Sequence, residues 1–135
     1  RGILKHRMKK KEERNNVMKK ANETVVLCGA SAYEEKYYLN PQFSKLPEHI
    51  RQELQIMCVL FTEEIGGIFT LEFDDHGNLQ FKTEATEADG FYDDIGGALK
   101  IKKLRVEKEE LLESLEMYYR VFFLGEDVDK EKTEA

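Results

Sequence analysis

Residues 68–84 carry the pattern that most restricts how this chain can fold, because two alternating apolar stretches flank a polar turn. The apolar side chains occupy every second position, and they are Phe69, Leu71, Phe73, Leu79 and Phe81. Successive side chains of a β-strand point to opposite faces, so this spacing places the whole set on one face. The turn at 74–78 contains Asp, Gly and Asn, which favour tight reversals. The sequence therefore predicts an antiparallel β-hairpin with one apolar face, which other elements must cover.

A helix is predicted between Pro47 and Gly66, where apolar residues recur mainly at intervals of three and four. This face consists of Ile50, Leu54, Met57, Cys58, Phe61 and Ile65. Proline is tolerated in a first helical turn, and the Gly66-Gly67 pair can adopt the left-handed conformation that ends a helix. Three more apolar residues lie around the other side, namely Ile56, Val59 and Leu60. We therefore expect this helix to be packed on most of its circumference.

The remaining segments complete the pattern of elements. Strands are expected at 24–28 and 33–39, and the second segment, which ends at Asn40-Pro41, is also compatible with a short helix. After the hairpin, the sequence indicates one helix capped by Asp89 and a last helix that ends at Leu124-Gly125. Their apolar residues are Phe91, Ile95, Ala98 and Leu99 in the first, and Leu111, Leu112, Leu115, Tyr118, Tyr119 and Phe122 in the second.

The predicted fold is a single α+β domain, in which an antiparallel sheet of about four strands packs against three helices in the order ββαββαα. Residues 98–106 are compatible with either a helix or a strand, because Leu99-Lys-Ile-Lys also alternates.

The charge of the chain divides it into a basic beginning and an acidic remainder. Residues 1–23 contain nine Lys or Arg and three Glu, and the rest contains 12 Lys or Arg and 24 Asp or Glu. Because the first segment lacks apolar periodicity, we expect a disordered basic arm at 1–22, a folded domain at 23–125 and a polar tail at 126–135. Met18 precedes the first predicted strand and is a candidate for the natural start.

The composition indicates a cytoplasmic protein without a membrane partner. No run of about 18 apolar residues is present, and the basic beginning lacks the apolar core of a secretory signal. Cys28 and Cys58 each lie in an apolar run, and we expect both to be reduced core residues. A catalytic thiol needs a base, and His6, His49 and His76 lie in the arm, at a helix start and in a turn.

One short phrase occurs twice, as FTEEIGG at 61–67 and FYDDIGG at 91–97. The first copy ends a predicted helix and the second begins one, and little else is shared, so the phrase is not interpreted as a duplication. Its carboxylates form a candidate metal site and are Glu63, Glu64, Asp93 and Asp94. They could bind a hard divalent cation if the two segments are neighbours, and the alternative is that they are solvated surface residues. The first glycine pair is expected to permit a turn, and the second close packing.

Three stretches carry a resemblance to a known group of proteins. They are VVLCGASAYEEKYY at 25–38, ELQIMCVLFTEEIGGIFT at 53–70 and MYYRVFFLG at 117–125. Together they resemble a family of small, uncharacterised bacterial proteins, a domain of unknown function that spans roughly residues 25 to 125. The resemblance implies no activity, cofactor or catalytic residue, and it leaves the basic arm outside the domain.

The leading functional prediction is a non-enzymatic interaction module without a cofactor, which self-associates as a homodimer through the last helix. Tyr118 and Phe122 continue the core seam of that helix, so we expect Tyr119 and Phe123 to be partly exposed beside Leu112. The alternative is that the sheet or another helix covers this flank.

Two other functions stay open from the sequence. The acidic pairs could belong to a divalent-metal-binding protein or a metal-dependent hydrolase. The basic arm could contact nucleic acid, although a solvated arm is the interpretation we favour.

We expect a protein that starts at Met18 to melt within a few degrees of the full chain, because residues 1–17 offer no apolar face to bury. Thermal unfolding of the two proteins measures this, and a large loss of stability would show that the arm docks on the domain. The same pair tests nucleic-acid contact, since binding through the arm should weaken steeply with salt.

Overall fold

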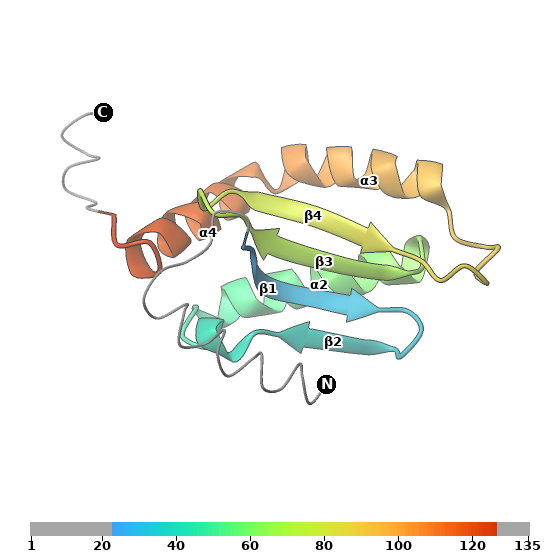
Figure 1. The fold of residues 1–135 in the computed structure, drawn as a ribbon, viewed down its shortest axis with the longest axis horizontal. Helices are drawn as coiled ribbons and strands as arrows, with labels where there is room; N and C mark the ends of the chain where they lie inside the picture. The colour runs from blue at the N-terminus through green and yellow to red at the C-terminus, as the bar shows by residue number, and fades with distance from the viewer. Residues whose placement is uncertain (1–22, 127–135) are drawn as a thin grey trace.

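The computed structural model of the chain describes residues 23–126 (Figure 1). The predicted basic arm, with Met18, lies outside the described residues, as does the predicted polar tail beyond Glu126. The described elements follow the order ββαββαα, with a short 3-10 helix between the second strand and the first α-helix. The predicted α+β fold is therefore confirmed.

Four antiparallel strands form one sheet in the order β2-β1-β3-β4. The strands are β1 (Val25–Ser31), β2 (Lys36–Leu39), β3 (Ile68–Phe73) and β4 (Leu79–Glu84). The predicted hairpin corresponds to β3 and β4, whose register pairs Leu71 with Phe81. The predicted strand at 33–39 is shorter than expected, because residues 32–35 form a turn in which Glu35 has a φ of 53°.

Within residues 23–126, three α-helices accompany the sheet, and they are α2 (Glu48–Glu64), α3 (Asp94–Glu107) and α4 (Glu109–Phe122), preceded by the 3-10 helix η1 (Pro41–Phe43). The ambiguous segment 98–106 is helical and belongs to α3. The cap of α3 is Asp93, whose Oδ1 accepts a hydrogen bond from the Gly96 amide at 2.9 Å. The predicted cap, Asp89, lies in the preceding loop and accepts a hydrogen bond from the Phe91 amide instead. No helix within residues 23–126 has the length and apolarity needed to cross a bilayer.

The helices give the sheet a buried face. Along β3, Phe69, Leu71 and Phe73 are fully buried, whereas the residues between them are only partly so. Figure 1 shows α2 behind the sheet, α3 running along the β4 side, and α4 near the turn between β3 and β4. The alternation read from the sequence therefore separates the helix-covered face from the opposite one.

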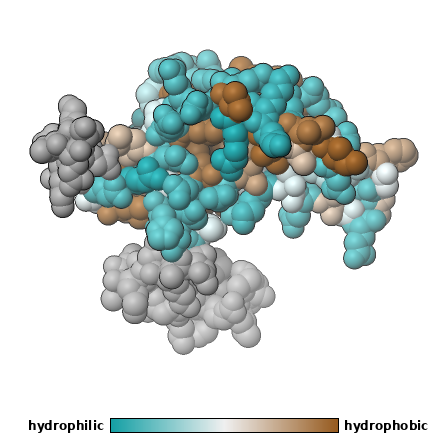
Figure 2. Space-filling model, turned by 90° about the horizontal axis from the view of Figure 1, so that it is seen from above, coloured by the Kyte–Doolittle hydropathy of each residue, from teal (hydrophilic) through white to brown (hydrophobic). Residues whose placement is uncertain are grey.

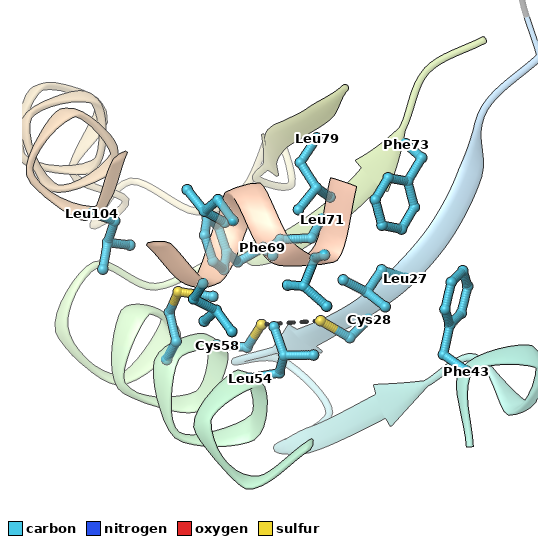
Figure 3. Close-up of a cluster of buried hydrophobic side chains, with 14 of the residues drawn as sticks. Leu27, Cys28, Phe43, Leu54, Cys58, Phe69, Leu71, Phe73, Leu79 and Leu104 are labelled. Carbon is cyan, nitrogen blue, oxygen red and sulfur yellow. Dashed lines mark hydrogen bonds between the residues drawn. The ribbon is translucent and has the colours of Figure 1, made fainter. Parts of the chain in front are cut away.

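Aromatic and sulfur contacts join α2 to the centre of the sheet (Figure 3). Phe61 stacks on Phe69 with ring centroids 3.9 Å apart, and the Sγ atoms of Cys28 and Cys58 lie 3.7 Å apart. Both cysteines are buried free thiols, as the sequence predicts. The hydrogen bond with Cys28 and burial raise the pKa of the Cys58 thiol, which therefore stays protonated at neutral pH. The two thiols are therefore a core contact, and the raised pKa shows that Cys58 is not an activated nucleophile.

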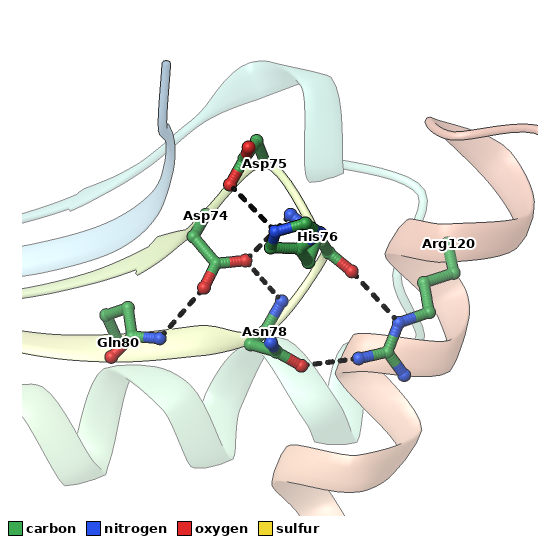
Figure 4. A network of polar contacts seen from close by, with 6 residues as sticks. All are labelled: Asp74, Asp75, His76, Asn78, Gln80 and Arg120. Atoms are coloured by element: carbon green, nitrogen blue, oxygen red, sulfur yellow. Dashed lines mark hydrogen bonds and ion pairs between the residues drawn. The ribbon is translucent and has the colours of Figure 1, made fainter. Parts of the chain in front are cut away.

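Arg120 of α4 holds the turn between β3 and β4 (Figure 4). Its guanidinium donates to the carbonyl oxygen of His76 at 3.3 Å and to Oδ1 of Asn78 at 2.6 Å. Within the turn, Oδ1 of Asp74 accepts from the amides of His76 and Asn78 at 2.9 Å, and Oδ2 accepts from the Gln80 side chain. Burial raises the pKa of Asp74, but these hydrogen bonds outweigh it, so the pKa lies below its usual value.

We expect the substitution Asp74→Asn to cost about 1 kcal/mol of unfolding free energy at neutral pH, because it weakens the hydrogen bonds that order the turn. The folded-state pKa of Asp74 is depressed, so its contribution is present above the unfolded-state pKa of about 3.9 and is lost as the pH falls through the folded value. Chemical denaturation between neutral and acidic pH should show the difference between the two proteins shrinking as the pH falls.

A suitable control is Asp75→Asn, since Asp75 contacts only the imidazole of His76, at 3.8 Å, among the interactions within the described chain. An equal loss in both variants, or a difference that does not change with pH, would contradict the role given to Asp74.

Candidate functional site

The two copies of the repeated phrase pack against each other. Gly66 and Gly67 turn the chain after α2 with φ values of 98° and 72°, and a Cβ on Gly67 would lie 2.7 Å from Cε1 of Tyr92. On the other side of this contact, a Cβ on Gly97 would lie 3.2 Å from Cγ2 of Ile65. The predicted roles of the glycines, a turn in the first copy and close packing in the second, are confirmed. The shared phrase therefore joins the end of α2 to the beginning of α3.

The four candidate metal ligands have separate surroundings despite this proximity. Asp93 caps α3, whereas Glu64 pairs with Lys100, its Oε1 lying 2.7 Å from Nζ. The hydrogen bond and charge of Lys100 hold the pKa of Glu64 below its usual value. Glu63 and Asp94 are exposed. In the part of the chain that is described, no group of three or more His, Cys, Asp or Glu is placed to hold a metal ion.

The Lys100 pair also accounts for an acidic residue at the end of α2, where carboxylates oppose the helix dipole. Lys100 belongs to the first half of α3, so this compensation exists only because α3 lies beside α2.

The predicted interaction residues on α4 differ in exposure: Tyr119 and Leu112 are buried and Phe123 is partly buried, so the exposure expected for Tyr119 is wrong. Tyr119 is 1% exposed, and its ring stacks on Phe73 with centroids 4.2 Å apart. Leu112 is also buried, and the partly buried Phe123 stacks on Phe43 of η1. Phe122, which was expected in the core, is 70% exposed. The sheet and η1 therefore cover the side of α4 that carries Tyr119 and Phe123, which is the alternative that the sequence also allowed.

The rotation of α4 explains this difference. Leu115 lies on both possible seams, one continuing through Tyr118 and Phe122 and the other through Tyr119 and Phe123, with the same spacing of three or four residues. Periodicity alone cannot choose between them. The contacts of Tyr119 with Phe73 and of Phe123 with Phe43 select the second seam.

Apolar residues are exposed instead along α3 and in the loop before it. We call these residues the α3 ridge, and they are Phe91, Ile95, Leu99 and Val106, exposed by 97%, 76%, 61% and 76%. Figure 2 views the molecule from the α3 side and shows hydrophobic residues gathered where α3 begins, within a largely hydrophilic surface. The sequence places Phe91, Ile95 and Leu99 on the apolar face of this helix, and the structure exposes that face to solvent.

A second apolar strip lies on α2. Ile56 and Leu60 are 59% and 50% exposed, so the expectation that α2 is packed on most of its circumference is wrong for these two residues. They line a groove between α2 and α3 whose floor includes Met57 and Leu104. Ion pairs join α2 to α3 through Glu64 and Lys100, and α2 to the junction of α3 and α4 through Glu53 and Lys108 at 3.0 Å. These pairs hold α3 against α2 and leave both strips accessible.

The signal for this surface is present in the sequence of α3. Gly97, Ile101 and Leu104 recur at helical spacing, and so do Ile95, Leu99 and Val106 on the opposite side. A helix with two apolar faces that packs against the rest of the domain on one side only must expose the other face to solvent. Leu104 is buried, so the other set is exposed.

We expect calorimetric titration with Ca²⁺, Mg²⁺ and Mn²⁺ to show no heat beyond dilution, since Asp93 and Glu64 already have partners and the four carboxylates do not converge. The matched variant changes all four to amides: Glu63→Gln, Glu64→Gln, Asp93→Asn and Asp94→Asn. A stoichiometric signal that disappears in this variant would establish the metal site.

Comparisons with known proteins identify a family but not an activity. No curated protein and no solved structure matches the chain. The model of DUF6145, described as a family of unknown function, matches residues 24–127, close to the domain limits expected from the sequence. Because this match spans well over half of the 135 residues, the chain belongs to the DUF6145 family.

Proposed function

We propose that the domain is a non-enzymatic interaction module whose contact surface is the α3 ridge. The observation that supports this is the exposure of four large apolar side chains in a row, from Phe91 to Val106. Scattered exposed apolar residues are normal on protein surfaces, whereas a contiguous row bordered by charge is typical of binding sites.

The energetics favour covering this surface. Removing a fully exposed Phe or Leu side chain from water is worth about 1.5–3 kcal/mol. Phe91 is almost completely exposed, and Ile95 and Val106 are each three-quarters exposed. A partner that covers the α3 ridge therefore gains several such contributions, and Ile95, Leu99 and Val106 already lie on a helix, so their backbone has little further entropy to lose.

The same residues contribute little to the stability of the domain itself. The apolar side chains that hold α3 in place point the other way, with Leu104 only 5% exposed and Gly97 against Ile65. A row of apolar residues that fold stability does not require is the pattern expected of a binding surface.

We expect a benzophenone side chain at position 99 to give a discrete crosslinked adduct in cells that express the full chain, because Leu99 lies in the middle of the α3 ridge. The matched position is Glu113, an exposed residue on α4. The adduct should form at position 99 only and should be lost when Ile95 and Val106 are both changed to Lys. Equal labelling at both positions, or none at position 99, would argue against the proposal.

Stability measurements provide the control for folding. Leu99→Ser should change the unfolding free energy by no more than about 0.5 kcal/mol, as for other exposed positions. Leu104→Ala, on the buried side of the same helix, should cost about 2–5 kcal/mol. Similar losses in both variants would show that Leu99 belongs to the core.

A further inference from the structure

The two cysteines of the chain face each other in the core (Figure 3). Cys28 lies on β1 and Cys58 on α2, 30 positions apart, and their Sγ atoms are separated by 3.7 Å. A disulfide bond is about 2.05 Å long, so the two sulfur atoms need to approach by only roughly 1.6 Å to form one. Both thiols are free, and the sequence contains no other cysteine. Any disulfide within one chain must therefore join this pair.

The closed structure protects this pair from oxidants. Cys28 and Cys58 have no exposed surface, and the hydrogen bond with Cys28 and burial raise the pKa of the Cys58 thiol. An oxidant reacts with a thiolate that it can reach, and the closed core provides neither access nor a thiolate at Cys58. The pair therefore reacts only when a neighbouring element moves away.

The element best placed to move is β2, which lies at the edge of the sheet. It has four residues, and within the sheet it pairs with β1 alone. Its Tyr37 lines an open groove of about 580 Å³ between α2 and the hairpin of β1 and β2. The hydroxyl of Tyr37 lies beside both thiols, and burial, together with these thiols, raises the pKa of Tyr37. The ring therefore reaches from the groove to the thiols.

The same hydroxyl makes the closed position of β2 less stable. Its oxygen is buried, and no residue in the described part of the chain gives it a hydrogen bond of ordinary geometry. The adjacent thiols are only weak partners. A buried polar group without a full hydrogen bond costs free energy, which is recovered when opening lets water reach it. Short edge elements also open locally while the rest of a domain stays folded, so β2 is the expected route to the thiols.

We propose that Cys28 and Cys58 are a redox-modification site, which hydrogen peroxide converts into a disulfide when β2 opens. One thiolate attacks a peroxide oxygen and the O–O bond breaks, which gives a sulfenic acid and, after proton transfer, water. The second thiol then attacks this sulfur, the S–S bond forms and the sulfenic oxygen leaves as a second water. Two thiols are thus oxidised, and one peroxide is reduced to two water molecules. The site does not involve the α3 ridge.

The disulfide links β1 to α2 and closes the loop 28–58, which contains β2 and η1. A cross-link of this kind restricts the unfolded chain, so the oxidised domain is expected to be more stable than the reduced one. The redox state of the pair therefore controls how firmly α2 is attached to the sheet.

Treatment of the full chain with excess hydrogen peroxide, followed by alkylation in denaturant, tests the site. We expect intact mass spectrometry to show a monomer that lacks two hydrogen atoms per chain at its cysteines and carries no alkyl group. Dithiothreitol should restore both thiols and lower the melting temperature by about 5 °C or more. This comparison is matched, because dithiothreitol does not reverse methionine oxidation. Thiols that can still be alkylated, a disulfide between two chains, or an oxidised protein that melts no higher than its reduced form would overturn the inference.

Variants of Tyr37 test the route to the thiols. Tyr37→Ala removes the ring and should be oxidised faster by about tenfold or more, whereas Leu104→Ala destabilises the domain from α3 and should accelerate oxidation much less. Tyr37→Phe keeps the ring but removes the buried hydroxyl, so it should be oxidised more slowly than the unmodified chain. Equal acceleration in the two alanine variants, or faster oxidation of Tyr37→Phe, would show that β2 does not control access and would overturn the inference.

Discussion

Phe61 of α2 stacks on Phe69 of β3 with ring centroids 3.9 Å apart, and the rest of the structure depends on this contact. It lies beside the Cys28–Cys58 contact and brings α2 onto the two central strands. A sheet with a row of large apolar side chains on one face must cover that face, and α2 is the first element after β2 that can do so. The position of α2 then determines where the later helices can pack.

The position of α3 follows from the end of α2. The turn at Gly66 and Gly67 leaves room for the ring of Tyr92, and Gly97 allows α3 to approach Ile65. Lys100 of α3 and Lys108, the residue that follows α3, form ion pairs with Glu64 and Glu53 of α2. Because Leu104 and Gly97 lie on the side of α3 that is buried, the opposite side of the helix faces solvent. The α3 ridge is thus a consequence of packing that the helix needs for its own attachment.

The other end of the sheet is closed by α4 in a different way. Arg120 binds the turn between β3 and β4, and Tyr119 stacks on Phe73, while Phe43 stacks beside both rings. Stacked aromatic side chains therefore fill the core at this end of the sheet. Because the stack includes η1, which precedes α2 in the chain, α4 connects the first and last parts of the domain.

Local patterns predicted a large part of the fold because they reflect the covalent geometry of strands and helices. The alternation at 68–84 and the face from Ile50 to Ile65 identified β3, β4 and α2, and the glycine pairs marked a turn and a close contact. The candidate site was predicted less well. The sequence proposed a metal site on condition that the two acidic segments are neighbours; the segments are in contact, but Asp93 caps its own helix and Glu64 pairs with Lys100, a contact between helices that spacing does not specify.

By itself the sequence determined which residues alternate, which repeat at helical intervals and where the chain reverses, since these depend on neighbours along the chain. Only the tertiary structure decided which of two equivalent faces is buried. On α4, contact with Phe73 buried Tyr119 and exposed Phe122, and on α3 the approach to Ile65 buried Gly97 and Leu104 and exposed Leu99. In a helix with apolar residues on two sides, the spacing along the chain does not determine which side is buried. The surface against which the helix packs determines it.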